Sequence, residues 1–268
     1  MPFVSSRGRD IYYERHGTGP AVLFLHGAGS NAATWWQQLP DFSASYICLT
    51  MDIRCFGRSV APVDEFSLCL FIADAMAVLD QECINRVVLI GQSLGGMICF
   101  RIALRYPERV AGFVACDTSL AIDHPVLVES IERRFKTVSA VSIEQRSLGA
   151  WFLNTQPALA ALYAQINHFN PSAYRISAEE WRTAMLTLNQ PCNLAATADV
   201  EKLRCPTLFL IGAEDPIVPS QVMRELSTRL PGSELLVLEE AAHSAYFEKA
   251  GEFNRHVLDF LRRRAAFQ

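Results

Sequence analysis

The segment Gly91-Gln92-Ser93-Leu94-Gly95 places a serine hydroxyl between two glycines in a Gly-x-Ser-x-Gly pattern. An aliphatic, β-branched run at residues 86–90 precedes this segment, and residues 96–106 have the apolar spacing of a helix. A serine on a sharp turn between a strand and a helix holds its hydroxyl above the sheet, and the flanking glycines avoid collisions with the neighbouring strand and helix. Ser93 is therefore the candidate nucleophile. The alternative is an ordinary turn rich in glycine and serine.

A base and an acid for such a nucleophile lie later in the chain. A serine hydroxyl is a poor nucleophile until a base takes its proton, so an imidazole must lie beside it. His243 is the candidate base, because it follows the last expected strand, at the sheet edge where Ser93 also emerges. Asp215 follows the preceding strand and is the candidate acid that holds the imidazole; the chain order Ser, Asp, His is that of known triads. Asp117, after the strand expected at residues 110–116, is the alternative acid.

The elements that position these residues alternate between strand and helix over the first 117 residues, which predicts a mostly parallel, doubly wound sheet. Residues 10–15 are expected to form an edge strand. Further strands are expected at residues 21–25, 46–51, 86–90, 110–116, 206–211 and 234–238, and helices at 34–39, 67–83, 96–106, 220–230 and 245–264.

Between residues 118 and 198 the sequence shows helical stretches and no strand. Ser142 with Gln145, and Ser177 with Glu180, have the spacing of capping boxes at helix starts. We therefore expect a helical insertion at residues 119–198, between the two parts of one core at residues 1–118 and 199–268.

Composition limits the class of protein. The chain has 268 residues, of which 50% are hydrophobic and 19% charged, enough for one large domain with a sizeable core. The net charge is −4 and the basic residues are scattered, so we expect no nucleic acid partner.

No apolar stretch in the sequence has the length and position expected of a signal peptide or a membrane span. The eight cysteines form no Cys-x-x-Cys pair and are interpreted as reduced thiols of a cytoplasmic protein. The oligomeric state stays open.

Five separated motifs resemble the α/β-hydrolase superfamily, in the branch of small esterases, lactonases and carbon–carbon bond hydrolases. In chain order they are His26-Gly27-Ala28-Gly29, Asp52-x-Arg54-x-x-Gly57-x-Ser59, the segment 91–96, Gly212-Ala213-Glu214-Asp215 with Pro219, and Ala242-His243 followed by Glu248. The resemblance covers nearly the whole chain outside the insertion. It implies an α/β-hydrolase fold with a helical cap inserted after the strand that ends near Cys116, and a catalytic triad of Ser93, Asp215 and His243.

The resemblance also implies roles for two loops. The oxyanion formed when a serine attacks a carbonyl needs two preorganised N–H donors, and these are expected from the backbone of Ala28 and Leu94. His26 is expected to brace its loop, and Asp52 and Arg54 to form a structural ion pair or a loop brace. Cys55 stands where the family usually has glycine, which puts the local loop conformation in question.

Aromatic residues suggest where a substrate binds. Trp35, Trp151 and Trp181 are the candidate substrate-binding residues, with the core of a small helical cap as the alternative role for those in the insertion. An apolar, aromatic roof favours an uncharged, medium-sized substrate. Arg175 and Arg182 could hold a substrate carboxylate, although as solvated surface charges they need no such role.

These features predict a serine hydrolase that needs no cofactor or metal and cleaves a carboxylic ester or lactone of a small to medium, largely apolar substrate through an acyl-enzyme. One alternative is hydrolysis of a carbon–carbon bond in a β-diketone-like or ring-cleavage product, although many such relatives have Asn where Gln92 stands. Another is a low-turnover ligand receptor on the same fold. A halide-displacing dehalogenase is disfavoured because it needs a carboxylate at position 93.

Overall fold

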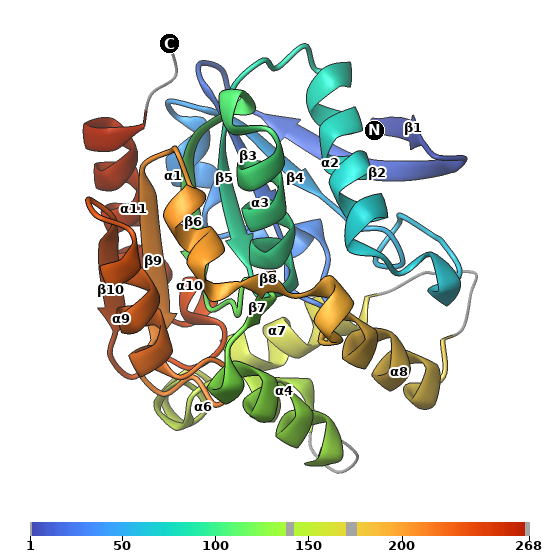
Figure 1. The fold of residues 1–268 in the computed structure, drawn as a ribbon, viewed down its shortest axis with the longest axis vertical. Coiled ribbons are helices and arrows are strands. Elements are labelled where there is room, and N and C mark those ends of the chain that lie inside the picture. Colours follow the sequence, from blue (N-terminus) through green and yellow to red (C-terminus); the bar gives the residue numbers. More distant parts are fainter. Residues whose placement is uncertain (1, 138–141, 170–175, 266–268) are drawn as a thin grey trace.

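A sheet of eight strands forms the centre of the computed structural model, which describes residues 2–137, 142–169 and 176–265 (Figure 1). The strand order is β1-β2-β4-β3-β5-β6-β9-β10. The strands are β1 (Phe3–Ser6), β2 (Arg9–His16), β3 (Ala21–Leu25), β4 (Ile47–Met51), β5 (Val87–Gln92), β6 (Val110–Cys116), β9 (Thr207–Gly212) and β10 (Glu234–Leu238). From β4 to β10 all neighbours are parallel, and β2 is antiparallel to both β1 and β4. The prediction of a mostly parallel α/β sheet is confirmed.

The expected edge strand at residues 10–15 is wrong in its position. β2 lies inside the sheet, since it pairs with β1 on one side and with β4 on the other. The edge is β1, which is only four residues long and was missed. Arg7 and Gly8 join the two strands with φ values of 47° and 77°, the left-handed backbone that a tight hairpin turn requires.

Helices cover both faces of the sheet. On one face lie α2 (Leu68–Gln81), α3 (Leu94–Arg105) and α9 (Ser220–Arg229); on the other lie α1 (Leu39–Ser43) and α11 (Ala250–Arg264). Along β3, Leu23 and Leu25 enter the first core, and Val22 and Phe24 enter the second. A strand buried on both faces needs apolar residues at every position, which explains the continuous apolar run at residues 21–25.

Two expected helices are each split. The helix expected at residues 34–39 is a 3₁₀ turn, η1 (Ala32–Trp35), followed by α1, whose first turn contains Pro40. Proline is tolerated in the first turn of a helix and not in its interior, so a new helix starts there. The last expected helix is α10 (Ala245–Glu248) and α11, separated by the non-helical backbone of Lys249. The other short 3₁₀ helices are η2 (Val63–Glu65), η3 (Pro107–Arg109), η5 (Pro191–Asn193) and η6 (Thr197–Lys202).

The segment between β6 and β9 forms a helical layer below the sheet in Figure 1. Its helices are α4 (Pro125–Thr137), α5 (Ile143–Ser147), α6 (Ala150–Thr155), α7 (Pro157–His168) and α8 (Ala178–Leu188). The expected absence of strands is wrong in one detail: β7 (Ile122–Asp123) and β8 (Ala195–Ala196) pair in parallel and join the two ends of the segment. Both predicted capping boxes are present, at the starts of α5 and α8.

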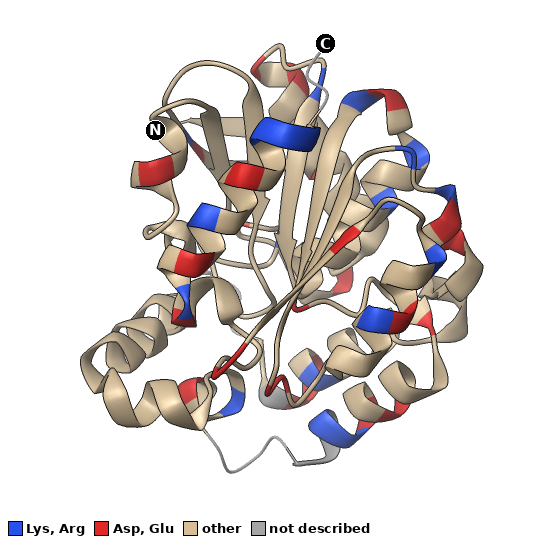
Figure 2. Cartoon of the chain, turned by 90° about the vertical axis from the view of Figure 1, so that its left-hand side faces the viewer, with Lys and Arg blue, Asp and Glu red and all other residues tan. Residues whose placement is uncertain are grey.

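Acidic and basic residues are interspersed along the helices in the view of Figure 2. None of the helices in the described ranges is long and apolar enough to cross a membrane.

Candidate active site

The site lies where the strand order changes direction. The chain passes from β3 to β4 on one side of it, and then to β5 on the other side. The loops that follow β3 and β5 therefore leave neighbouring strands in opposite directions, which opens a crevice at the carboxyl end of the sheet. Ala28 in the first loop and Ser93 after β5 both line one cavity.

Ser93 occupies a strained turn between β5 and α3. Its backbone has φ 50° and ψ −113°, a conformation that costs energy for a residue other than glycine. The Ser93 N–H donates to the carbonyl of Cys116 at 3.0 Å, and the Thr118 hydroxyl donates to the Ser93 carbonyl at 2.7 Å. These bonds to the end of β6 hold the strained residue in place.

The expected need for glycine on both sides of Ser93 is confirmed. A Cβ atom on Gly95 would lie 2.1 Å from the carbonyl oxygen of Leu25 in β3, and one on Gly91 would lie 2.5 Å from the backbone of Gly95. Both distances are far inside van der Waals contact, so any side chain would push α3 away from the sheet and move the serine.

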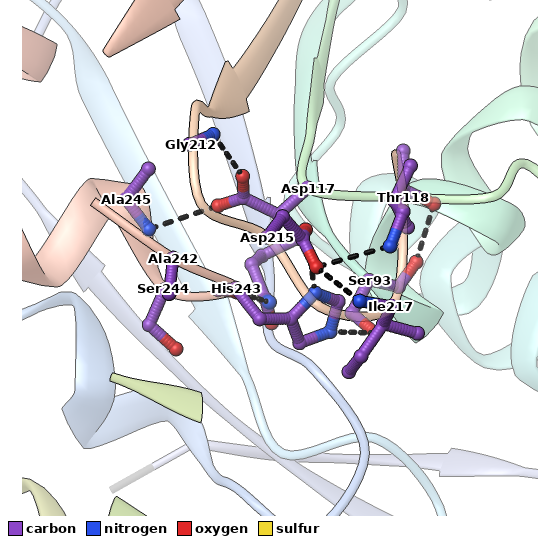
Figure 3. Close-up of polar contacts among 12 residues, drawn as sticks. Ser93, Asp117, Thr118, Gly212, Asp215, Ile217, Ala242, His243, Ser244 and Ala245 are labelled. Atoms are coloured by element: carbon purple, nitrogen blue, oxygen red, sulfur yellow. Dashed lines mark hydrogen bonds and ion pairs between the residues drawn. The ribbon is translucent and has the colours of Figure 1, made fainter. Parts of the chain in front are cut away.

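Ser93, His243 and Asp215 form a continuous hydrogen-bonded chain (Figure 3). His243 Nε2 lies 3.0 Å from Ser93 Oγ, and His243 Nδ1 lies 2.8 Å from Asp215 Oδ2. The other carboxylate oxygen of Asp215 accepts the N–H groups of Ile217 at 2.7 Å and Val218 at 3.0 Å. The ionised carboxylate can only accept, so Nδ1 carries the proton and Nε2 is free to accept the serine proton. The structure thus brings together all three residues expected from the sequence.

Asp117, the alternative acid, holds backbone instead of the imidazole. One of its oxygens accepts the N–H of Gly212 at 2.9 Å and the other accepts the N–H of Ala245 at 2.9 Å (Figure 3). Burial, and secondarily the nearby charge of Asp215, raise the pKa of the Asp117 carboxyl well above its ordinary value. Asp117 therefore ties the end of β6 to the end of β9 and to the start of α10.

The two expected oxyanion donors are in suitable places. Leu94 is the first residue of α3, where backbone N–H groups have no partner within the helix and the helix dipole favours negative charge. Ala28 lies across the cavity in the loop after β3. Within the parts of the chain that the structure describes, neither amide donates to a protein acceptor. Their role in holding an oxyanion stays a prediction.

Two buried side chains fix the loop that carries His243. Gln92 Nε2 donates to the carbonyl oxygen of His243 at 2.7 Å. Glu248 Oε1 accepts the N–H groups of Ala242 at 2.9 Å and Ser244 at 3.3 Å, on either side of the histidine. Its other oxygen accepts the N–H of Gly149, just before α6, at 2.7 Å. Glu248 thus joins the histidine loop to the helical segment, a role that its place in the sequence motif did not reveal.

Glu248 should make stability depend on pH. Burial raises its pKa from 4.5 to about 7, against the lowering effect of the three backbone donors. Because the folded protein holds this proton more tightly than the unfolded chain, the stabilisation is present below about pH 4.5 and is lost as the pH rises through about 7. We expect the melting temperature of the wild type, relative to that of Glu248→Gln, to fall by a few degrees between pH 5 and 8, at roughly 2–4 °C per kcal/mol. A difference in melting temperature that is constant over this range, measured by calorimetry, would contradict the assignment.

The three tryptophans expected at the substrate site have different surroundings. Trp181 in α8 lines the cavity and packs edge-on against Phe56 at 5.2 Å between ring centroids. The prediction for Trp35 is wrong: its side chain is 0% exposed and packs behind the cavity against Tyr246, with the two rings tilted and 4.5 Å between their centroids. The prediction for Trp151 is also wrong, because this ring lies at the surface under the Lys249 ammonium. Helical periodicity could not show which aromatic side chains face the sheet.

The cavity is less apolar than expected. It has a volume of about 140 Å³, close to that of an engineered site that holds benzene. Arg134 of α4 and Arg146 of α5 both line it, beside apolar residues such as Ile131 and Met185. One signal in the sequence could have indicated this: Arg134 follows the buried Ile131 by three positions and so lies on the inward face of its helix.

In the described chain, no group of His, Cys, Asp and Glu side chains is arranged as a metal site would require.

The arginines considered from the sequence are placed differently. Arg182 is about half exposed and pairs with Glu179 at 2.7 Å on the outer face of α8. It is therefore a solvated surface charge. Arg175 lies outside the described residues.

Of the two roles expected for Asp52 and Arg54, the structure shows the loop brace and not an ion pair between them. Asp52 accepts the N–H groups of Ala32 and Arg58, each at 2.7 Å. Arg54 pairs instead with the buried Asp74 at 2.7 Å, because α2 brings that carboxylate to it.

Two other expectations for these loops can be checked. Cys55 has φ 73°, a left-handed backbone that favours glycine, the residue usual in the family at this position. The bracing role of His26 is confirmed: its Nδ1–H donates to the carbonyl of Gly27 at 2.7 Å, and its Nε2 accepts the N–H of Ile53 at 2.9 Å. Complete burial lowers the pKa of His26 to about 4, so this ring stays neutral.

Comparison with known proteins agrees with the fold. A family model described as alpha/beta hydrolase fold matches residues 20–250, so the chain belongs to this family. It is 27% identical to a pimeloyl-[acyl-carrier protein] methyl ester esterase of Vibrio parahaemolyticus, over 94% of this chain and 98% of that one. It is 28% identical to a 2-hydroxy-6-oxo-6-phenylhexa-2,4-dienoate hydrolase of Comamonas testosteroni, over 95% of this chain and 92% of that one.

Among solved structures, the chain resembles Est816, described as an N-acyl homoserine lactone degrading enzyme. The TM-score is 0.83 and the identity 26%, over 97% of this chain and 100% of that one.

Proposed function

We propose that this protein is a serine hydrolase that cleaves a carboxylic ester or lactone through an acyl-enzyme on Ser93. The hydrogen-bonded chain of Ser93, His243 and Asp215, open to a cavity at the carboxyl end of the sheet, is the observation that carries the proposal. Relatives described as a methyl ester esterase and as a lactone-degrading enzyme support the same bond class.

The geometry suits a two-step reaction. Ser93 Oγ attacks the substrate carbonyl carbon while its proton passes to His243 Nε2, and Asp215 stabilises the imidazolium that forms. The negative charge on the carbonyl oxygen is held by the N–H groups of Ala28 and Leu94. The carbon–oxygen bond then breaks, and the leaving alcohol takes the proton from Nε2. Water repeats the sequence on the acyl-enzyme, which releases the acid and restores the serine.

A steady-state assay tests this proposal against the two alternatives. We expect turnover of p-nitrophenyl acetate and butyrate, and of a γ-lactone followed by proton release. Turnover of a β-diketone without any ester or lactone hydrolysis would favour carbon–carbon bond cleavage, the second candidate, which the similarity to a dienoate hydrolase supports. No turnover of any of these substrates, with tight binding of one, would favour a receptor.

The acyl chain length should affect the rate. A methylene that is buried in the cavity contributes about 0.8 kcal/mol, so kcat/KM for neutral p-nitrophenyl esters should rise severalfold from acetyl to butyryl. A cavity of about 140 Å³ has limited room, so we expect kcat/KM to fall again for much longer chains, because overpacking a rigid site costs more than burial returns. The kinetic profile from acetyl to dodecanoyl tests this expectation. A profile that is flat, or that is highest for the longest chain, would contradict a closed pocket.

We further propose that residues 119–198 act as a cap over the site, since α4, α5, α7 and α8 all contribute residues to the cavity wall. The cellular location proposed is a reducing compartment such as the cytoplasm. The eight cysteines are all free thiols, which supports that location.

A further inference from the structure

Two cationic side chains of the helical segment face the cavity that contains Ser93. Arg134 comes from α4 and Arg146 from α5, and both belong to the same cavity wall as His243. Arg134 Nη1 donates to the backbone carbonyl of Arg146 at 3.2 Å, so the two residues are neighbours. Neither is used in the reaction steps derived above.

Within the described residues, no carboxylate forms an ion pair with Arg146, and its buried Nε has no hydrogen-bond acceptor. Glu144 lies two residues earlier, and the charge of Arg146 helps to lower the pKa of its carboxyl. The two side chains do not form an ion pair, and the buried Oε2 of Glu144 has no hydrogen-bond partner among the described residues. A buried N–H donor of a guanidinium without an acceptor is costly, so the position of the Arg146 Nε favours an anion that a ligand supplies.

Arg134 adds to the electrostatic cost of this site. Burial, followed by the neighbouring charge of Arg146, lowers the pKa of Arg134 to about 10. Two adjacent cations repel each other, and an anion between them reverses the sign of the interaction for both. A guanidinium presents several N–H donors in one plane, which match the two oxygens of a carboxylate.

We propose that Arg134 and Arg146 form an anion subsite that binds a carboxylate carried by the substrate, at a distance from the carbonyl that Ser93 attacks. This inference rests on the proposed function and narrows its substrate class to half-esters or lactones with a free carboxylate. Ile131 and Ile143 line the cavity beside the arginines, so the part of the substrate between its two polar ends is apolar. This proposal differs from the expectation of an uncharged substrate.

Two pairs of substrates of matched length test the subsite. On the acyl side, mono-p-nitrophenyl glutarate is compared with p-nitrophenyl valerate, after subtraction of the uncatalysed rate. On the alcohol side, p-acetoxybenzoate is compared with its methyl ester. A charge-assisted hydrogen bond contributes about 1.5–3 kcal/mol, so the wild type should favour the carboxylate member of one pair by roughly 10–100-fold in kcat/KM.

Three variants separate the subsite from a general effect on the fold. Arg146→Gln and Arg134→Gln should each lower that preference, taken as the ratio of kcat/KM for the two members of the pair, by about tenfold or more. Activity on the neutral ester shows that each variant is folded. Arg182→Gln, which removes an exposed cation of the same helical segment, should leave the preference unchanged. Absence of a preference in both pairs, or a preference that both glutamine variants retain, would overturn the subsite.

A binding measurement does not depend on turnover. In Ser93→Ala, monomethyl glutarate should raise the melting temperature more than methyl valerate does, and Arg146→Gln in that background should remove the difference. If no ester is hydrolysed by the wild type but this difference is seen, the subsite stands and the proposed hydrolysis fails. If hydrolysis is seen without any such difference and without a preference for the carboxylate substrates, the hydrolase stands and the subsite fails.

Discussion

Ser93→Ala is expected to leave a folded protein with kcat for its best ester lowered by ~10³-fold or more. The hydroxyl is the only part that is removed, and the alanine methyl group fits wherever the serine Cβ was. What is lost is the covalent step, because His243 then has no alcohol to activate within its 3.0 Å contact. The measurements are steady-state kinetics and a melting curve for both proteins.

Covalent labelling provides an independent test of the same residue. A sulfonyl fluoride or an organophosphate should add once to the wild-type protein, at Ser93, and should not add to Ser93→Ala. Ser30→Ala removes another hydroxyl from the wall of the same cavity and should still be labelled. An intact mass without an adduct, or an adduct mapped to another serine, would count decisively against the triad.

Asp215→Asn is expected to lower kcat by ~10²–10⁴-fold. An asparagine amide group at this position would donate to His243 Nδ1 and would hold the proton on Nε2, where it can no longer accept from the serine. The backbone bonds from Ile217 and Val218 to the retained oxygen allow the variant to keep its fold. The kinetics should therefore change far more than the melting temperature.

Asp117→Asn is the matched control, because this carboxylate is also buried and lies near that of Asp215. It accepts hydrogen bonds from the Gly212 and Ala245 amides and does not contact the imidazole in the described structure. We expect a loss of stability from a mismatched amide donor, with a smaller loss of kcat than for Asp215→Asn. Losses of kcat in the reverse order would assign the acid to Asp117.

Local signals in the sequence were enough to predict the core and the candidate reacting groups. Continuous apolar runs arise because parallel strands are buried on both faces, and the glycines beside Ser93 arise because β3 and α3 approach too closely for any side chain. Both requirements act within a few residues of chain, so they are visible without the fold. The placement of His243 and Asp215 after successive strands followed from the same rule, since parallel strands end at one edge.

Only the tertiary structure decided what surrounds the reacting groups. The side chains of Trp35 and Trp181 face different spaces because their helices pack on different elements, and no periodicity within either helix encodes that choice. Arg54 forms its ion pair with Asp74 and not with the nearby Asp52, because the packing of α2 places Asp74 beside the Arg54 guanidinium. Arg134 and Arg146 meet at the cavity only because α4 and α5 are folded over the sheet edge. Contacts between segments far apart in the chain depend on how the helices pack, and this is why the charge of the pocket emerged from the fold and not from the sequence.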